Sequence, residues 1–122
     1  MTERHDVTGA CLCGAVRFTA TLPDRALGVC WCSQCRRQCS GPLVAVSAAE
    51  RWLIDGFPGS WRASDHATRG FCGKCGSTLY WQRDGEGPQF TLGVLDARDG
   101  YRITSVVHAE DRPRVADLEA LR

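Results

Sequence analysis

The segment Cys30-Trp31-Cys32-Ser33-Gln34-Cys35 places three sulfurs within six residues. Two thiolates separated by one residue lie close together in a turn, and a third thiolate just beyond them can converge on the same metal ion. A zinc ion with three protein ligands keeps a free coordination position, which is typical of catalytic zinc. This spacing therefore predicts a zinc site that can bind a substrate.

Cys39, four residues after Cys35, leaves a second interpretation open. Its sulfur could serve as a fourth ligand and close the site, and the protein would then be a zinc-stabilised binding or structural module. A redox role with a Cys35–Cys39 disulfide is disfavoured, because residues four apart on a helical turn have poor disulfide geometry. The number of protein ligands at this ion thus separates the two main interpretations.

A second set of cysteines is divided between two distant parts of the chain. Cys11-x-Cys13 is followed by Gly14, and Cys72-x-x-Cys75 is likewise followed by a glycine. Glycine suits a knuckle, in which the backbone turns sharply so that N–H groups point at the sulfurs. Because four thiolates make the closed site of structural zinc, we predict a structural zinc ion bound by these four cysteines.

The composition excludes several classes of protein. The eight cysteines in 122 residues would be read as disulfides in a secreted chain, but their spacing favours metal binding in a reducing compartment. A net charge of +1, without charge runs, predicts no nucleic-acid partner. The polar first residues lack the apolar core of a signal peptide, and no apolar segment approaches the roughly 18 residues of a membrane span. We therefore expect a cytoplasmic protein with no membrane partner.

Short apolar segments separated by glycine turns predict an all-β domain. Val16 and Phe18 alternate with Arg17 and Thr19 in a half-buried strand over residues 15–20. Asp55-Gly56 predicts a hairpin that pairs the strand before it with residues 61–63. Further strands are expected at residues 27–29, 43–46, 52–54, 77–82, 89–95 and 101–108, one helical turn capped by Ser33 at residues 33–37, and a polar loop at residues 64–69. We expect residues 1–122 to form one domain, with residues 113–122 as a loose tail.

The cysteine-containing segments together resemble a known family. Residues 11–18, 30–37 and 69–80 resemble the three signature motifs of the glutathione-dependent formaldehyde-activating enzyme family, which also includes centromere protein V-like proteins. Residues 91–96 resemble that family's strand near the C-terminus. The resemblance extends over residues 8–112.

This resemblance implies a β-tent fold with two zinc ions. The structural ion would be bound by Cys11, Cys13, Cys72 and Cys75, and the catalytic ion by Cys30, Cys32 and Cys35. The implied reaction is of the carbon–sulfur lyase type, in which glutathione and formaldehyde condense to S-hydroxymethylglutathione. The expected partner is therefore a small thiol such as glutathione.

The residues next to the three-cysteine segment are candidates for substrate binding. Arg36 and Arg37 could pair with a substrate carboxylate, because a guanidinium binds a carboxylate through two hydrogen bonds, or they could simply be solvated. Trp31 could form a wall of the substrate pocket or anchor the core. His66 is expected to be a free surface histidine, and proton transfer or zinc contact is the alternative. No role is assigned to His5 and His108, and Asp65 and Asp96 are expected in turns.

Overall fold

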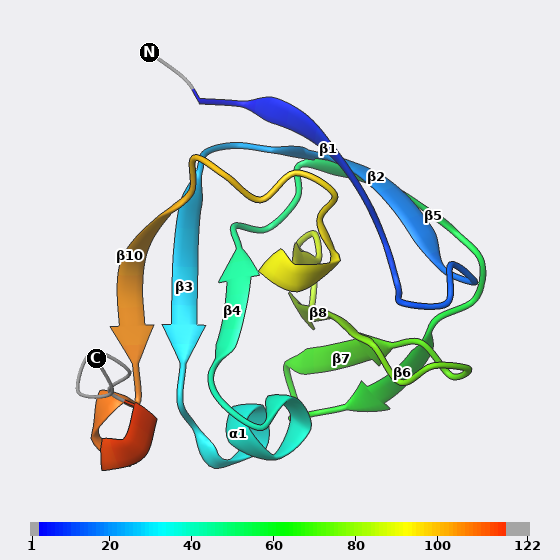
Figure 1. Cartoon of the computed structure of the whole chain (residues 1–122). Coiled ribbons are helices and arrows are strands. Elements are labelled where there is room, and N and C mark those ends of the chain that lie inside the picture. Colours follow the sequence, from blue (N-terminus) through cyan, green and yellow to red (C-terminus); the bar gives the residue numbers. More distant parts are fainter. Residues whose placement is uncertain (1–2, 117–122) are drawn as a thin grey trace.

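The computed structural model describes residues 3–116, which form three small β-sheets and one short α-helix (Figure 1). The predicted all-β class is confirmed. The sheets pack together around one hydrophobic core, as expected of a β-tent (Figure 1). Within the described residues, no helix has the length and apolarity needed to cross a membrane.

The first sheet has the antiparallel order β1-β2-β5, and its strands are β1 (His5–Ala10), β2 (Arg17–Leu22) and β5 (Arg51–Asp55). Its inner face is apolar because side chains alternate along β2. Phe18, Ala20 and Leu22 are buried, whereas Arg17 and Thr19 are exposed. The predicted alternation is therefore confirmed.

The second sheet carries the helix α1 (Ser33–Cys39). Its strands are β3 (Ala26–Cys30), β4 (Leu43–Val46) and β10 (Arg102–Val107), in the order β10-β3-β4. Helix α1 connects β3 to the antiparallel β4 at one end of this sheet (Figure 1). Strand β10 pairs with β3 in parallel, so both strands end on the side of the sheet where α1 begins.

The third sheet has the antiparallel order β6-β7-β8-β9, and its strands are β6 (Gly59–Arg62), β7 (Ala67–Phe71), β8 (Thr78–Arg83) and β9 (Gln89–Phe90). The 3₁₀ helix η1 (Leu92–Val94) follows β9 and packs against the core. The core joins the sheets through a stacked ring pair. Phe18 of β2 and Phe90 of β9 have ring centroids 3.8 Å apart.

Two predictions around residues 55–69 are wrong. Strand β5 does not form a hairpin with residues 61–63; it pairs with β2, and β6 pairs with β7. Gly56 turns with a positive φ of 101° against the Ala15 carbonyl, and Pro58 then lacks the N–H group that continued pairing would need. The predicted loop at residues 64–69 overlaps β7, because Arg69 is buried in that strand by contacts with α1.

Other predicted boundaries differ less. The strand expected at residues 89–95 ends at Phe90 and is followed by η1. The 3₁₀ helix η2 (Ala109–Asp111) lies just before the expected tail, and η3 (Arg114–Ala116) lies within it. Residues 117–122 of that tail lie outside the described residues.

Candidate metal centres and the adjoining cavity

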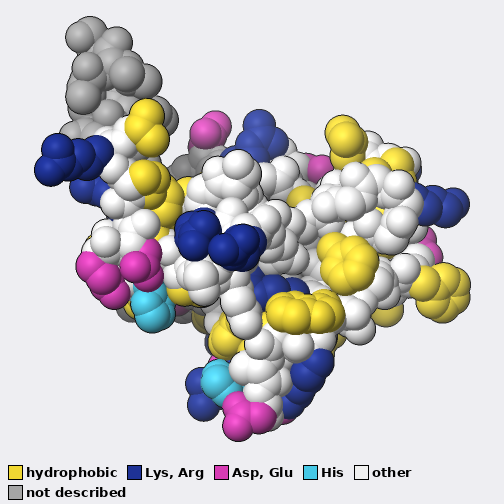
Figure 2. All heavy atoms as spheres, turned by 90° about the horizontal axis from the view of Figure 1, so that it is seen from below, with side chains coloured by type: hydrophobic (Ala, Val, Ile, Leu, Met, Phe, Trp, Pro, Cys, Tyr) yellow, Lys and Arg dark blue, Asp and Glu magenta, His cyan; other side chains and the backbone are white. Residues whose placement is uncertain are grey.

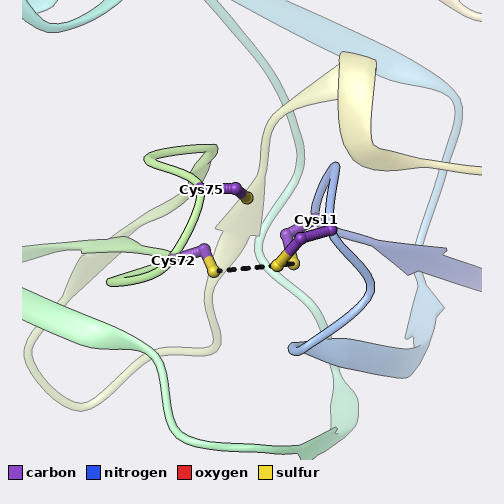
Figure 3. Close-up of side chains that lie close together, drawn as sticks. Cys11, Cys72 and Cys75 are labelled. Atoms are coloured by element: carbon purple, nitrogen blue, oxygen red, sulfur yellow. Dashed lines mark hydrogen bonds between the residues drawn. The ribbon is translucent and has the colours of Figure 1, made fainter.

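The structure brings together the four cysteines that were predicted to bind one ion. The sulfurs of Cys11, Cys13, Cys72 and Cys75 all lie within 4.8 Å of one another. Cys72 and Cys75, in the loop after β7, face Cys11 in the loop after β1 (Figure 3). These residues could hold a metal ion, because four sulfurs at this spacing form a closed site.

Local turns position these sulfurs. Gly14 and Gly76 both have φ of +79°, a conformation that glycine adopts without strain, so the predicted knuckle geometry is confirmed. The Val16 N–H group donates to the Cys11 sulfur at 3.3 Å. Hydrogen bonds from the Ser77 hydroxyl, and from the N–H groups of Ser77 and Cys13, lower the pKa of Cys75 to about 5.

The second cluster lies where β3 meets α1. The sulfurs of Cys30, Cys32 and Cys35 also lie within 4.8 Å of one another. Cys30 ends β3, and Cys35 is buried in the first turn of α1. Cys32, not the predicted Ser33, is the N-cap, because its sulfur accepts a hydrogen bond from the Cys35 N–H group at 3.4 Å. The helix start thus fixes two of the three sulfurs.

Cys39 lies outside this group of sulfurs, although it is on the same helix. Its side chain packs against Cys35 and its apolar neighbours. Burial, and then the nearby Cys35 sulfur, raise the pKa of the Cys39 thiol. The described residues therefore offer three sulfurs, not four, to an ion at this place.

The three-cysteine cluster is partly shielded from water. Burial, and then the sulfurs of Cys35 and Cys32, raise the pKa of Cys30 to about 12. Cys30 is thus protonated in the metal-free protein at neutral pH. Because a metal ion needs the thiolate, we expect metal binding to displace this proton.

Arg69 is the one buried charged side chain among residues 3–116, with 4% of its surface exposed. From β7 its guanidinium reaches the helix α1. It donates to the Cys35 sulfur at 3.3 Å, to Gln38 Oε1 at 2.8 Å and to Gln34 Oε1 at 3.3 Å. The guanidinium therefore contacts the three-cysteine cluster directly.

A cavity of about 420 Å³ adjoins the three sulfurs. Apolar side chains form much of its wall, and they are Val29, Leu43, Ala45, Ala63, Trp81 and Val107. The polar lining includes Gln34, Ser64, Gln89 and Ser105. This volume suits a small organic ligand, and the mixture of apolar wall and few polar groups is typical of ligand sites.

Two histidines line the same cavity, although the sequence favoured a free surface position for His66 and gave His108 no role. His66 has its Nδ1 3.0 Å from Asp65 Oδ1. His108 lies near the C-terminal end of the described residues, with Nδ1 3.7 Å from Glu110 Oε1. Figure 2 shows histidine side chains beside acidic ones on the face seen from below. The cavity therefore has groups that can carry protons next to the sulfurs.

The register of the second sheet explains His108. In the parallel pairing of β10 with β3, Val107 lies opposite Cys30, and the Trp31 N–H group donates to the Val107 carbonyl at 3.1 Å. His108 follows Val107 and so lies beside the cysteine segment. No local signal in the sequence indicates this, because the pairing joins segments far apart in the chain.

The predicted substrate-binding residues lie outside this cavity. Trp31 and Arg36 line another hollow together with Pro42. Arg37 lines a third hollow beside Trp61. The part of these three side chains in substrate binding stays a prediction.

Comparison with known proteins agrees with the site. The family model of the glutathione-dependent formaldehyde-activating enzyme matches residues 6–110. A protein of Schizosaccharomyces pombe that is named an uncharacterized lyase is 35% identical over 114 residues, covering 90% of this chain and 83% of the yeast protein. The chain belongs to the glutathione-dependent formaldehyde-activating enzyme family.

Proposed function

We propose that this protein is a zinc-dependent carbon–sulfur lyase that acts on the adduct of a thiol and a small aldehyde. The reaction that we assign to it is the condensation of glutathione with formaldehyde to S-hydroxymethylglutathione. One observation carries the proposal. The three sulfurs of Cys30, Cys32 and Cys35 meet at a cavity of about 420 Å³ from which the Cys39 sulfur is absent.

The donor set fits zinc. Zn²⁺ prefers sulfur and nitrogen ligands, and three thiolates leave one of its four positions for another ligand. When bound there, the ion would stabilise the thiolate form of a substrate sulfur by its positive charge. The four-cysteine cluster has the donor set of a closed structural zinc site, and we assign a structural role to it.

The reaction needs no oxidant or reductant. The thiol sulfur adds to the aldehyde carbon and a C–S bond forms, while the C=O π bond breaks and the thiol proton ends on the oxygen as a hydroxyl. The protein must therefore position two small molecules and move one proton. The cavity wall around Val29 and Trp81 would exclude water and hold the reactants, and Gln34, Gln89 and Ser105 would bind the peptide groups of the thiol.

We assign the proton transfer to His66. Its Nδ1 is within hydrogen-bond distance of Asp65 Oδ1, which would hold one ring nitrogen and leave Nε2 for the substrate. The corresponding distance from His108 Nδ1 to Glu110 Oε1, 3.7 Å, is too long for a hydrogen bond. His108 would then mainly help to hold the substrate.

Exchange spectroscopy tests the reaction itself. Carbon-13 formaldehyde and glutathione are brought to equilibrium, and NMR measures the rate of exchange between free aldehyde and adduct with and without the protein. The wild-type protein should accelerate exchange, and Cys35→Ser should abolish the acceleration. Cys39→Ser is the matched control on the same helix and should keep the activity. An exchange rate no faster than that of the buffer would overturn the proposal.

Cobalt substitution tests the open position. We expect the visible ligand-field bands of the Co²⁺ protein to shift and saturate as glutathione is added. Bands that stay unchanged until metal is lost would favour the alternative, a binding or structural module with a closed site. Trp31, Arg36 and Arg37 are tested separately by Ala variants: a higher KM at unchanged kcat would support a role at the rim, and an unchanged KM would remove them from the substrate site.

A further inference from the structure

A buried guanidinium needs a compensating charge. The Arg69 side chain is a cation, and a charge taken out of water is costly unless it is paired. Its acceptors are the amide oxygens of Gln34 and Gln38, which are neutral, and the Cys35 sulfur. None of the ion pairs among residues 3–116 includes Arg69. The negative charge that it faces is therefore that of the cysteine cluster.

We infer that Arg69 is a positioning residue that neutralises the three-cysteine site and thereby makes it accept an anionic fourth ligand. Three thiolates and one divalent ion carry a net charge of −1, and the Arg69 guanidinium brings the total to zero. An incoming thiolate then gives −1 in the wild-type site, but −2 if Arg69 is replaced by a neutral residue. A neutral ligand adds no charge to the site in either protein, so this charge difference does not affect its binding.

This inference rests on the proposed function, because it explains how the site selects a thiolate. It differs from a purely structural role, in which Arg69 would only hold α1 against β7 through Gln34, Cys35 and Gln38. Loss of a structural role would weaken the binding of neutral and anionic fourth ligands equally. Loss of the charge would weaken anions alone.

The test compares an anionic and a neutral ligand on the Co²⁺ protein at one pH. We use 2-mercaptoethanol, which binds as a thiolate, and imidazole, and read both dissociation constants from the visible spectrum. In Arg69→Met we expect the Kd of 2-mercaptoethanol to rise about tenfold or more, because one nearby unit charge at a partly buried site is lost. The Kd of imidazole should change less than about threefold. Arg69→Lys should restore most of the thiolate affinity.

A second variant keeps Arg69 in place. Gln38→Glu places a carboxylate of the same shape beside the Arg69 guanidinium, which now donates to Gln38 Oε1 at 2.8 Å. This variant should fold, because it adds an ion pair to an existing hydrogen bond, and it should lose thiolate affinity as Arg69→Met does. Arg62→Met is the control, since Arg62 lies on the neighbouring strand β6 and pairs with the exposed Asp84.

The outcomes separate the two claims. Equal losses for both ligands in Arg69→Met, or an unchanged thiolate affinity in Gln38→Glu, would overturn the role of Arg69. If the wild-type Co²⁺ protein binds 2-mercaptoethanol but not glutathione, the proposed substrate is wrong while the role of Arg69 still stands on the two variants.

Discussion

The Ser77 hydroxyl lies 3.2 Å from the Cys75 sulfur, and it also accepts a hydrogen bond from the Leu12 N–H group at 3.0 Å. One side chain thus connects the two knuckles of the four-cysteine cluster, which come from opposite halves of the chain. This contact is the largest cause of the low pKa of Cys75. The cluster therefore contains a stabilised thiolate before any metal is bound.

In the metal-free protein, Cys75 should be alkylated before Cys13. The pKa of Cys75 is about 5, so Cys75 is a thiolate at pH 7. The pKa of Cys13 is raised to about 11, because burial and the neighbouring sulfurs raise it more than the hydrogen bond from the Ala15 N–H group lowers it. Only the thiolate reacts with iodoacetamide. Peptide mass spectrometry after brief labelling at pH 7 measures both rates. Cys13 is the matched control, since it is the more exposed of the two.

The same shift predicts a pH dependence of stability. The folded pKa of Cys75 is about 5, below the reference value of 9.0, so its stabilising contribution to the metal-free protein is complete above about pH 9 and declines as the pH falls toward 5. Ser77→Ala should flatten this part of the curve of unfolding free energy against pH. A curve that is identical in the wild-type protein and in Ser77→Ala would contradict this assignment.

Loss of one knuckle cysteine should destabilise the whole domain. Cys72 is 1% exposed and belongs to the four-cysteine set that joins the first and third sheets. We expect Cys72→Ser to lose one metal ion per chain and to lower the melting temperature by about 10 °C or more, since a structural metal contributes several kcal/mol to folding. Elemental analysis and calorimetry measure the two effects. Cys39→Ser should retain the full metal content.

The ring pair in the core carries a large share of stability. Phe90 is 1% exposed and stacks on Phe18, so Phe90→Ala should reduce the free energy of unfolding by about 3–5 kcal/mol. Urea denaturation of the metal-loaded protein measures the loss. Phe57→Ala is the control, because Phe57 is 97% exposed and its removal should change stability by less than about 0.5 kcal/mol. A similar cost for both variants would show that the stacked pair is not central.

Replacement of His66 should slow the reaction without loss of metal. If His66 transfers the proton, His66→Gln should lower kcat about a hundredfold or more, while zinc content and thiol affinity stay unchanged. His108→Gln should mainly raise KM. His5→Gln is the control, since the His5 ring contacts Tyr101 away from the cavity. A His66→Gln variant with wild-type kcat would reassign the proton transfer.

Local spacing was enough to predict the three-cysteine cluster. Sulfurs one or two residues apart can meet through a single turn, so the grouping of Cys30, Cys32 and Cys35 follows from the sequence alone. The turn at Gly14 and the alternating faces of β2 were likewise predictable, because each depends on neighbouring residues.

The surroundings of the site depended on tertiary structure. The parallel pairing of β10 with β3 brings His108 to the cavity, and the packing of α1 on β7 buries Arg69, which looked like a loop residue. Long-range pairing likewise joins β5 to β2, where the sequence predicted a local hairpin at Gly56. A cysteine knuckle depends on the backbone angles of a few neighbouring residues. The other contacts join residues tens of positions apart, and their pairing depends on how the three sheets pack around one core.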